Sequence, residues 1–391
     1  MRTLLLLALL GLPACSGGTP AAEAESNAAE PAPVHTKTVL SDVYHVDTIY
    51  KSMRGPWSQK QVYLDDPSKP ELLWITGYQT RIVDAKTDKR IGPDFMCHAN
   101  LDFDVDQYYS DFKTDHGLSG RVFTLSQGQQ HIEFPSAWGI PFLSTEPLEL
   151  TTQVLNLNIP DPNMDVQHQV TIEYVKDSEL TSPMKPLFQG AVEGFKSLEG
   201  EGLVYGVSDP SMEKHGAGCA VGASAIKGDV DYDTFGRKFT AHWVVQPGRE
   251  VTRTDVTKFL NLQFDTKVHY IAVHLHPYAE SLTLIDKTTG KTVYKADVVN
   301  DKDKVGLAKV PFYSSDEGTP VYEDHEYELV SVYNNTTDEP VDSMAVMYLY
   351  MEDPSWEKPD MSQIAPVTPD ESKAHAAGNP SAGKAADAPG M

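Results

Sequence analysis

Cysteine and basic residues are both scarce in this 391-residue chain. Three cysteines, Cys15, Cys97 and Cys219, allow at most one bridge and one odd thiol, which excludes a disulfide-stapled scaffold. Lysine and arginine total 32 against 56 acidic residues, and the formal charge is −24. Because a field of that sign repels phosphate backbones, we expect no nucleic-acid partner.

Long apolar runs and several common motifs are also missing. After residue 12 no stretch is long and apolar enough for a membrane span, and sustained helical periodicity is rare. The chain has no Gly-x-Ser-x-Gly, no phosphate-cradling loop and no dinucleotide fingerprint. Serine-hydrolase and nucleotide-dependent chemistry are therefore not indicated.

The N-terminus has the pattern of a signal peptide over residues 1–14. Arg2 precedes an apolar run from Leu4 to Leu12, which is too short to remain as a membrane span. Leu12-Pro13-Ala14-Cys15 is similar to a bacterial lipobox, so we expect lipidation of Cys15. The protein would then be a periplasmic or outer-membrane lipoprotein, which contacts the membrane through its lipid anchor alone. Ordinary secretion is the alternative.

If Cys15 carries the lipid, Cys97 and Cys219 remain as an even pair in an oxidising compartment, either as a disulfide or as two free thiols.

Composition divides the rest of the chain. Residues 15–33 and 353–391 are rich in Ala, Pro, Gly and Ser, which predicts a disordered tether and a disordered tail. A Gly- and Ser-rich linker at 197–212 separates two predicted domains, 34–196 and 213–352. Short alternating runs between turn residues predict an all-β fold of two tandem antiparallel β-sandwich, jelly-roll-like domains.

One strand of the second domain carries two imidazoles on the same face. In the run from Tyr270 to His276 the side chains alternate, so His274 and His276 point to one side and Val273 and Leu275 to the other. Two such imidazoles can chelate one metal, although two exposed polar residues on a half-buried strand would give the same pattern.

A second strand favours the metal hypothesis. The run from Asp342 to Met351 places Met344, Val346, Tyr348 and Tyr350 on one face. The other methionines of this run are predicted to fill the core. A thioether together with two imidazoles suits copper.

These segments resemble the second catalytic domain of the copper type II, ascorbate-dependent monooxygenases, the family of peptidylglycine alpha-hydroxylating and dopamine beta-monooxygenases. The resemblance covers roughly residues 200 to 352, including Val244-Val245-Gln246-Pro247-Gly248. It implies that His274, His276 and Met344 bind the copper where oxygen and substrate meet, and that ascorbate or another external reductant supplies electrons.

The first domain resembles the family through Glu133 to Phe142 and the strand leading to Asn158. In the family an electron-storing copper is bound there by three histidines. The matching positions in this chain are Cys97, His98 and Asn158, so one imidazole of three is kept. A disulfide between Cys97 and Cys219 would remove Cys97 as a ligand. Otherwise Cys97 and His98 could form a softer copper site, with His215 as a further candidate.

The substrate-binding positions of the family also differ. Its carboxylate-clamping arginine corresponds to Ala272 and an asparagine corresponds to Val346, whereas a tyrosine is kept as Tyr348. Without the arginine no bidentate clamp forms, which favours a more apolar substrate than a glycine-extended peptide. The sequence thus predicts a copper-dependent hydroxylase that uses O2 on a small organic substrate. A non-catalytic copper-binding lipoprotein and a metal-free adhesion or carbohydrate module are the alternatives.

Overall fold

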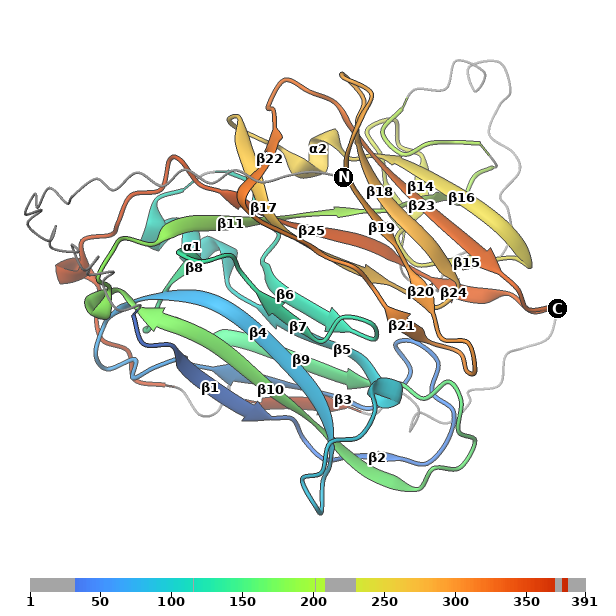
Figure 1. The fold of residues 1–391 in the computed structure, drawn as a ribbon, viewed down its shortest axis with the longest axis horizontal. Coiled ribbons are helices and arrows are strands. Elements are labelled where there is room, and N and C mark those ends of the chain that lie inside the picture. The colour runs from blue at the N-terminus through green and yellow to red at the C-terminus, as the bar shows by residue number, and fades with distance from the viewer. Residues whose placement is uncertain (1–31, 115, 201, 208–229, 370–374, 379–391) are drawn as a thin grey trace, which may run out of the picture. The chain divides into compact units, whose positions relative to one another are not determined.

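The computed structural model describes residues 32–369 and 375–378, apart from residues 115, 201 and 208–229. These residues form an all-β fold with β-sandwich character, as the sequence predicts (Figure 1). The helices among them are short: α1 (Val105–Phe112), α2 (Thr257–Leu260) and three 3-10 turns, η1 (Pro93–Phe95), η2 (Asp177–Glu179) and η3 (Met361–Gln363).

The largest sheet joins strands from both halves of the chain. Its order is β1 (His35–Leu40), β10 (Met164–Lys176), β4 (Leu72–Asp84), β8 (Trp138–Leu143), β11 (Lys185–Glu193), β25 (Ala345–Glu352), β17 (Thr266–Leu275) and β22 (Tyr313–Val321), with β2 (Tyr44–Val46) on β10 and β7 (His131–Glu133) on β4. The β8–β11 contact is parallel and the other pairs are antiparallel. The β11–β25 pairing joins the two halves of the chain within this sheet.

Smaller sheets cover the large one. A five-stranded sheet has the order β26 (His375–Gly378), β3 (Trp57–Val62), β9 (Leu148–Val154), β5 (Met96–Asp102) and β6 (Arg121–Ser126). A four-stranded sheet has the order β16 (Gly248–Asp255), β23 (Tyr327–Asn335), β18 (Ala279–Asp286) and β19 (Lys291–Asp297). The remaining strands are β12 (Lys196–Ser197), β13 (Asp231–Tyr232), β14 (Lys238–Thr240), β15 (Trp243–Val245), β20 (Val299–Asn300), β21 (Leu307–Lys309) and β24 (Val341–Ser343).

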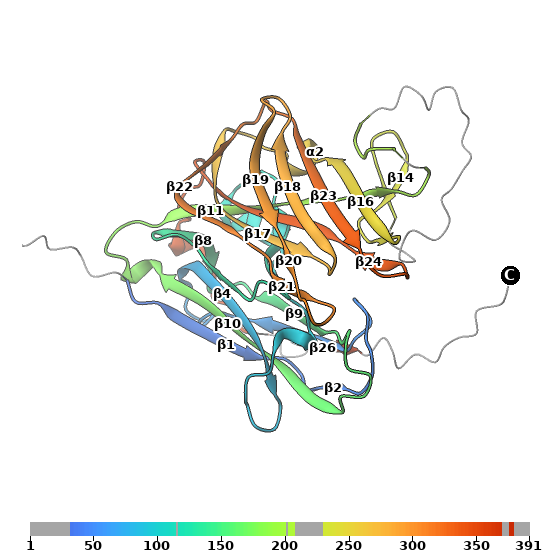
Figure 2. The ribbon, with the colours of Figure 1, turned by 45° about the vertical axis from the view of Figure 1, so that its right-hand side comes forward.

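Two large apolar cores lie between these layers. The first packs β4 and β10 against β3, β5, β6 and β9, and the second packs β17 and β25 against β18 and β23 (Figure 2). β17 and β25 contribute to both, because Tyr270 and Tyr348 face the first core while Ile271 and Met347 face the second. The alternation in the sequence predicts these two faces.

Two segments of low-complexity composition pack against the folded chain. Within the expected linker, Leu203 and Tyr205 join Phe195 and Phe239 in a third small cluster. Within the expected tail, Trp356 and two further apolar side chains, Met361 and Ile364, pack against the first core. A tail beginning at residue 353 is therefore placed too early, because these widely spaced apolar residues bury surface that the composition of the whole segment hides.

Candidate metal centre

β17 lies between β22 and β25, and this pairing fixes the direction of its histidines. His274 pairs with Val346 and Leu275 with Ala345 across the β17–β25 register. Because Val273 and Leu275 are buried in the second core, His274 turns to the opposite face. His276 follows the last residue of the strand, and both imidazoles line one cavity of about 490 Å³.

The two imidazoles are held by their Nδ1 atoms. Their ring centroids lie 5.4 Å apart with the planes nearly perpendicular. His274 Nδ1 lies 3.2 Å from Ser126 Oγ, and His276 Nδ1 lies 3.0 Å from Asp342 Oδ2. When Nδ1 donates to an oxygen, the lone pair of Nε2 is free for a metal ion, as in most metal-binding histidines.

Met344 lines the same cavity from the chain between β24 and β25. The Tyr333 hydroxyl accepts a hydrogen bond from the His276 backbone N–H at 3.1 Å and donates one to the Met344 carbonyl. A single buried side chain on β23 thereby ties the end of the histidine strand to the methionine. The structure brings His274, His276 and Met344 to one cavity, as the sequence predicts.

The electrostatics of the cavity favour a neutral imidazole at His274. Burial lowers the pKa of His274 well below its ordinary value, and the neighbouring His276, His98 and His242 lower it further. The half-buried Asp342 has its carboxylate oxygens shielded from solvent, and Oδ2 lies 3.0 Å from His276 Nδ1. A carboxylate at this distance can orient the His276 ring.

Two first-domain residues reach the same cavity. β5 and β9 lose register between Met96 and His98, and this irregularity lets the consecutive side chains Cys97 and His98 both line the cavity. Burial, with the nearby Arg121 and histidines, lowers the pKa of His98 to about 3, and burial raises the pKa of the Cys97 thiol to about 11. Cys97 is a free thiol in the described part of the chain.

Asn158 does not line the cavity. Its Nδ2 donates to the Val305 carbonyl, and its Oδ1 accepts from the Val305 N–H, both at 2.9 Å. Both polar ends of the amide are therefore engaged with the segment before β21. Asn158, which the resemblance aligns with the third histidine of the family, is thus engaged with the Val305 backbone outside the cavity lining.

Tyr348 lines the same cavity beside Arg121, which the sequence does not single out. Thr124 Oγ1 donates to the Tyr348 hydroxyl at 3.0 Å. Arg121 donates to both oxygens of Asp102, at 2.6 and 3.1 Å, and also lines the cavity. No local motif marks Arg121, Ser126, Asp342 or Tyr333, since their roles depend on contacts between distant strands.

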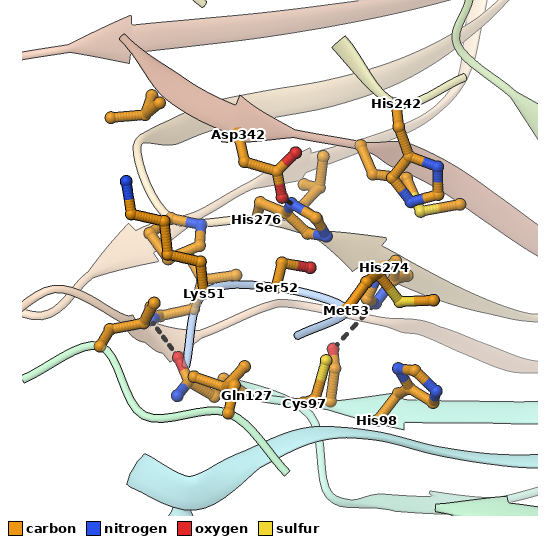
Figure 3. A pocket seen from close by; sticks show the side chains of 18 of the residues that line it. Lys51, Ser52, Met53, Cys97, His98, Gln127, His242, His274, His276 and Asp342 are labelled. Carbon is orange, nitrogen blue, oxygen red and sulfur yellow. Dashed lines mark hydrogen bonds and ion pairs between the residues drawn. The ribbon is translucent and has the colours of Figure 1, made fainter. Parts of the chain in front are cut away.

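Figure 3 shows how the labelled side chains are arranged. His242 and Asp342 face the cavity from one side, and Met53, Cys97 and His98 face it from the other, with His274 and His276 between them. The His242 and His276 ring centroids are 6.2 Å apart. Cys15, His215 and Cys219 lie outside the described residues, so the lipid site and the Cys97–Cys219 disulfide stay predictions.

The described residues contain no group of three or more His, Cys, Asp or Glu side chains placed to hold a metal ion, and methionine is not among these residue types. No helix in this part of the chain is long and apolar enough to cross a membrane.

Comparisons with known proteins leave the family open. No family model matches the chain, and no curated protein matches it. Among solved structures, the STIV MCP has a TM-score of 0.30 at 9% identity, covering 82% of this chain and 97% of its own. PNGase F, a glycosylasparaginase from Flavobacterium meningosepticum, has a TM-score of 0.32 at 8% identity, covering 88% and 100%. Likenesses at this level carry no argument about function.

Proposed function

We propose that the protein is a copper-dependent monooxygenase-like enzyme, which hydroxylates a small organic substrate with O2 and an external reductant. The observation that carries this proposal is the ligand set in one cavity. His274 and His276 have their Nδ1 atoms engaged by Ser126 and Asp342, and Met344 lines the same cavity. Two imidazoles and a thioether are a donor set that suits copper in both of its oxidation states.

The donor chemistry fits the metal on two further counts. Burial keeps His274 neutral and able to coordinate, and the Asp342 carboxylate lies 3.0 Å from His276 Nδ1, which leaves Nε2 of that ring for the metal. When bound, copper supplies one-electron redox chemistry and the activation of oxygen. His274, His276 and Met344 would hold it, and Asp342 and Ser126 would orient the imidazoles.

The cavity is also suited to an organic substrate. Apolar side chains such as Leu157, Tyr278 and Pro340 form much of its wall, and about 490 Å³ of space is large enough for a small molecule. Ala272 offers no charge, and the Arg121 guanidinium is already paired with Asp102. These features support a substrate without a carboxylate handle, with Tyr348 and Thr124 as the polar contacts that orient it.

Copper content and oxygen uptake test this proposal on the full-length chain. We expect His274→Ala and Met344→Leu to lose one bound copper per chain, and ascorbate-driven oxygen consumption to fall with it. His45→Ala is the matched control, because His45 lies on β2 outside the cavity and pairs with Asp165. Unchanged copper content in His274→Ala would exclude this site.

A second function, copper sequestration or delivery without turnover, is favoured by one observation. Asn158 is bound to Val305, so the three-ligand electron-storing site implied by the resemblance is incomplete. The same copper measurement would then show metal bound at His274, but ascorbate and oxygen would give no substrate-dependent oxygen uptake. That pair of results would select the binding protein over the enzyme.

The cellular place of the protein is part of the proposal. We infer a lipid anchor at Cys15 that holds the chain outside the cytoplasm of a bacterial cell. Cys15→Ser is expected to move the full chain from the membrane fraction to the soluble fraction of the cell envelope. Cofractionation of Cys15→Ser with membranes would contradict lipidation at this residue.

A further inference from the structure

One polar side chain of the cavity wall, that of Asn100 on β5, has no part in the copper site proposed above. Asn100 is 7% exposed and lines the cavity. Its Oδ1 is shielded from solvent and has no hydrogen-bond partner among the described residues. A buried amide oxygen without a partner costs free energy, which a bound group that donates a hydrogen bond would recover.

Strand pairing places a second polar side chain next to this amide. Asn100 lies directly opposite Thr124 in the β5–β6 register, and Thr124 also lines the cavity. Side chains of directly opposite residues lie on the same face of a sheet, with Cβ atoms about 5 Å apart. The neighbouring residues Ala99 and Leu125 enter the first core, so Asn100 and Thr124 face away from it.

A hydroxyl and a guanidinium complete this polar group. Thr124 Oγ1 donates to the Tyr348 hydroxyl at 3.0 Å, which leaves the Tyr348 proton for another acceptor. The irregular pairing after Leu101 sets Arg121 opposite Asp102, and the guanidinium lines the cavity. Burial raises the pKa of the Tyr348 hydroxyl, and the positive charge of Arg121 opposes this rise. The tyrosine thus offers a proton where the asparagine offers a lone pair.

The polar group lies at a fixed offset from the histidine that is proposed to bind copper. On β6, Thr124 is two residues from Ser126, whose Oγ lies 3.2 Å from His274 Nδ1. On β25, Tyr348 is likewise two residues from Val346, which pairs with His274. Two residues of a strand span about 7 Å. One small molecule can therefore reach from this polar group to the histidine.

We propose that Asn100 and Tyr348 bind the polar group of the substrate, and that this group is a hydroxyl or a carboxamide. Either group can accept a hydrogen bond from the Tyr348 hydroxyl and donate one to Asn100 Oδ1. A carboxylate has no proton to donate, and an ammonium ion has no lone pair and would meet the charge of Arg121. This substrate class belongs to the enzyme proposed above and rests on that function.

Equilibrium binding of five phenyl compounds to the full-length chain, without reductant, tests the proposal by calorimetry. 2-Phenylethanol and 2-phenylacetamide carry the two proposed groups. Phenylacetate, 2-phenylethylammonium and ethylbenzene carry an anion, a cation and no polar group. We expect each of the first two to bind at least about tenfold tighter than each of the other three. The tighter of the two identifies the group as a hydroxyl or as a carboxamide.

Two variants assign this preference to the polar group. Asn100→Leu keeps a side chain of similar size, so 2-phenylethanol should fall to the affinity of ethylbenzene, while unchanged binding of ethylbenzene shows an intact cavity. Tyr348→Phe removes only a hydroxyl and should weaken 2-phenylethanol in the same way. Gln61→Leu is the matched control, because Gln61 is an amide on β3 outside the cavity, and it should keep the preference of the wild type.

Equal binding of the five compounds overturns the proposal, as does unchanged binding of 2-phenylethanol in Asn100→Leu. The preference should persist in His274→Ala, since this variant leaves Asn100 and Tyr348 in place. If His274→Ala keeps the preference and also keeps every copper, the proposed function fails and the polar group stands as a binding site. If His274→Ala loses copper and the wild type shows no preference, the substrate class alone fails.

Discussion

Tyr333 is the residue on which the proposed copper site depends most outside its ligands. Its hydroxyl links the His276 N–H to the Met344 carbonyl, and its side chain is 1% exposed. It acts as a positioning residue, because the two backbones it joins carry one imidazole and the thioether. A phenylalanine would keep the packing of the ring and remove only this link.

We therefore predict that Tyr333→Phe lowers copper affinity about tenfold or more and stability by about 1–3 kcal/mol. Chelator competition measures the affinity, and urea unfolding measures the stability. Tyr327→Phe is the matched control, because the buried Tyr327 hydroxyl likewise joins two backbone groups, both of Tyr322, away from the cavity. Equal loss of copper affinity in both variants would contradict a positioning role for Tyr333.

Glu146 gives a pH-dependent prediction at the same scale. Burial, together with the neighbouring Asp111, raises the pKa of its carboxyl to about 10, and its Oε1 has no hydrogen-bond partner in the described part of the chain. The unfolded value is about 4.3. The folded state therefore holds a proton that the unfolded state has lost, so the contribution of Glu146 to stability is complete below pH 4.3 and falls as the pH rises toward 10.

Replacing the Glu146 carboxyl by an amide should remove this loss of stability at high pH. We predict that Glu146→Gln is more stable than the wild type at pH 8, by about 1–3 kcal/mol, and that the difference shrinks toward pH 5. Urea unfolding at both pH values measures it. Glu149→Gln, an exposed carboxyl on β9, should show no such trend. A constant difference between pH 5 and pH 8 would show that Glu146 is ionised in the fold.

At the scale of elements, the loop before β3 shapes one wall of the cavity. The Gly55 contact with Val154 leaves no room for a methyl group, so Gly55→Ala must push the loop away from β9. We predict that Gly55→Ala destabilises the protein by about 1–3 kcal/mol, which urea unfolding measures. Gly92→Ala is the control, because its nearest contact is the end of the Asp94 side chain at 3.1 Å. Equal stability of the two variants would contradict a close packing of this loop against β9.

The strand that carries His274 shows what sequence patterns can predict. Alternation of polar and apolar residues from Tyr270 to His276 indicates both the strand and the face of each side chain, because one face must enter a core. The same rule would place Cys97 and His98 on opposite faces of β5. The structure instead has a register shift near Cys97, which lets both side chains line the cavity. This shift depends on the pairing with β9 and has no local signal in the sequence.

At the scale of the whole molecule, the antiparallel β11–β25 pairing joins strands that the sequence assigns to two separate sandwiches. Gln189 pairs with Tyr350 and Val192 with Met347, and these four residues carry no mark of their pairing. A contact between distant strands likewise brings Ser126 to His274. Local patterns predict the fold class and the three proposed copper ligands, whereas the residues that support them depend on this assembly.

Elemental analysis of the copper retained by the full-length chain decides whether His274 holds a metal ion. The wild type and His274→Ala would be loaded with copper, dialysed side by side and measured per chain. We expect one copper fewer in His274→Ala than in the wild type. Equal copper in the two proteins, or none in the wild type, would contradict it.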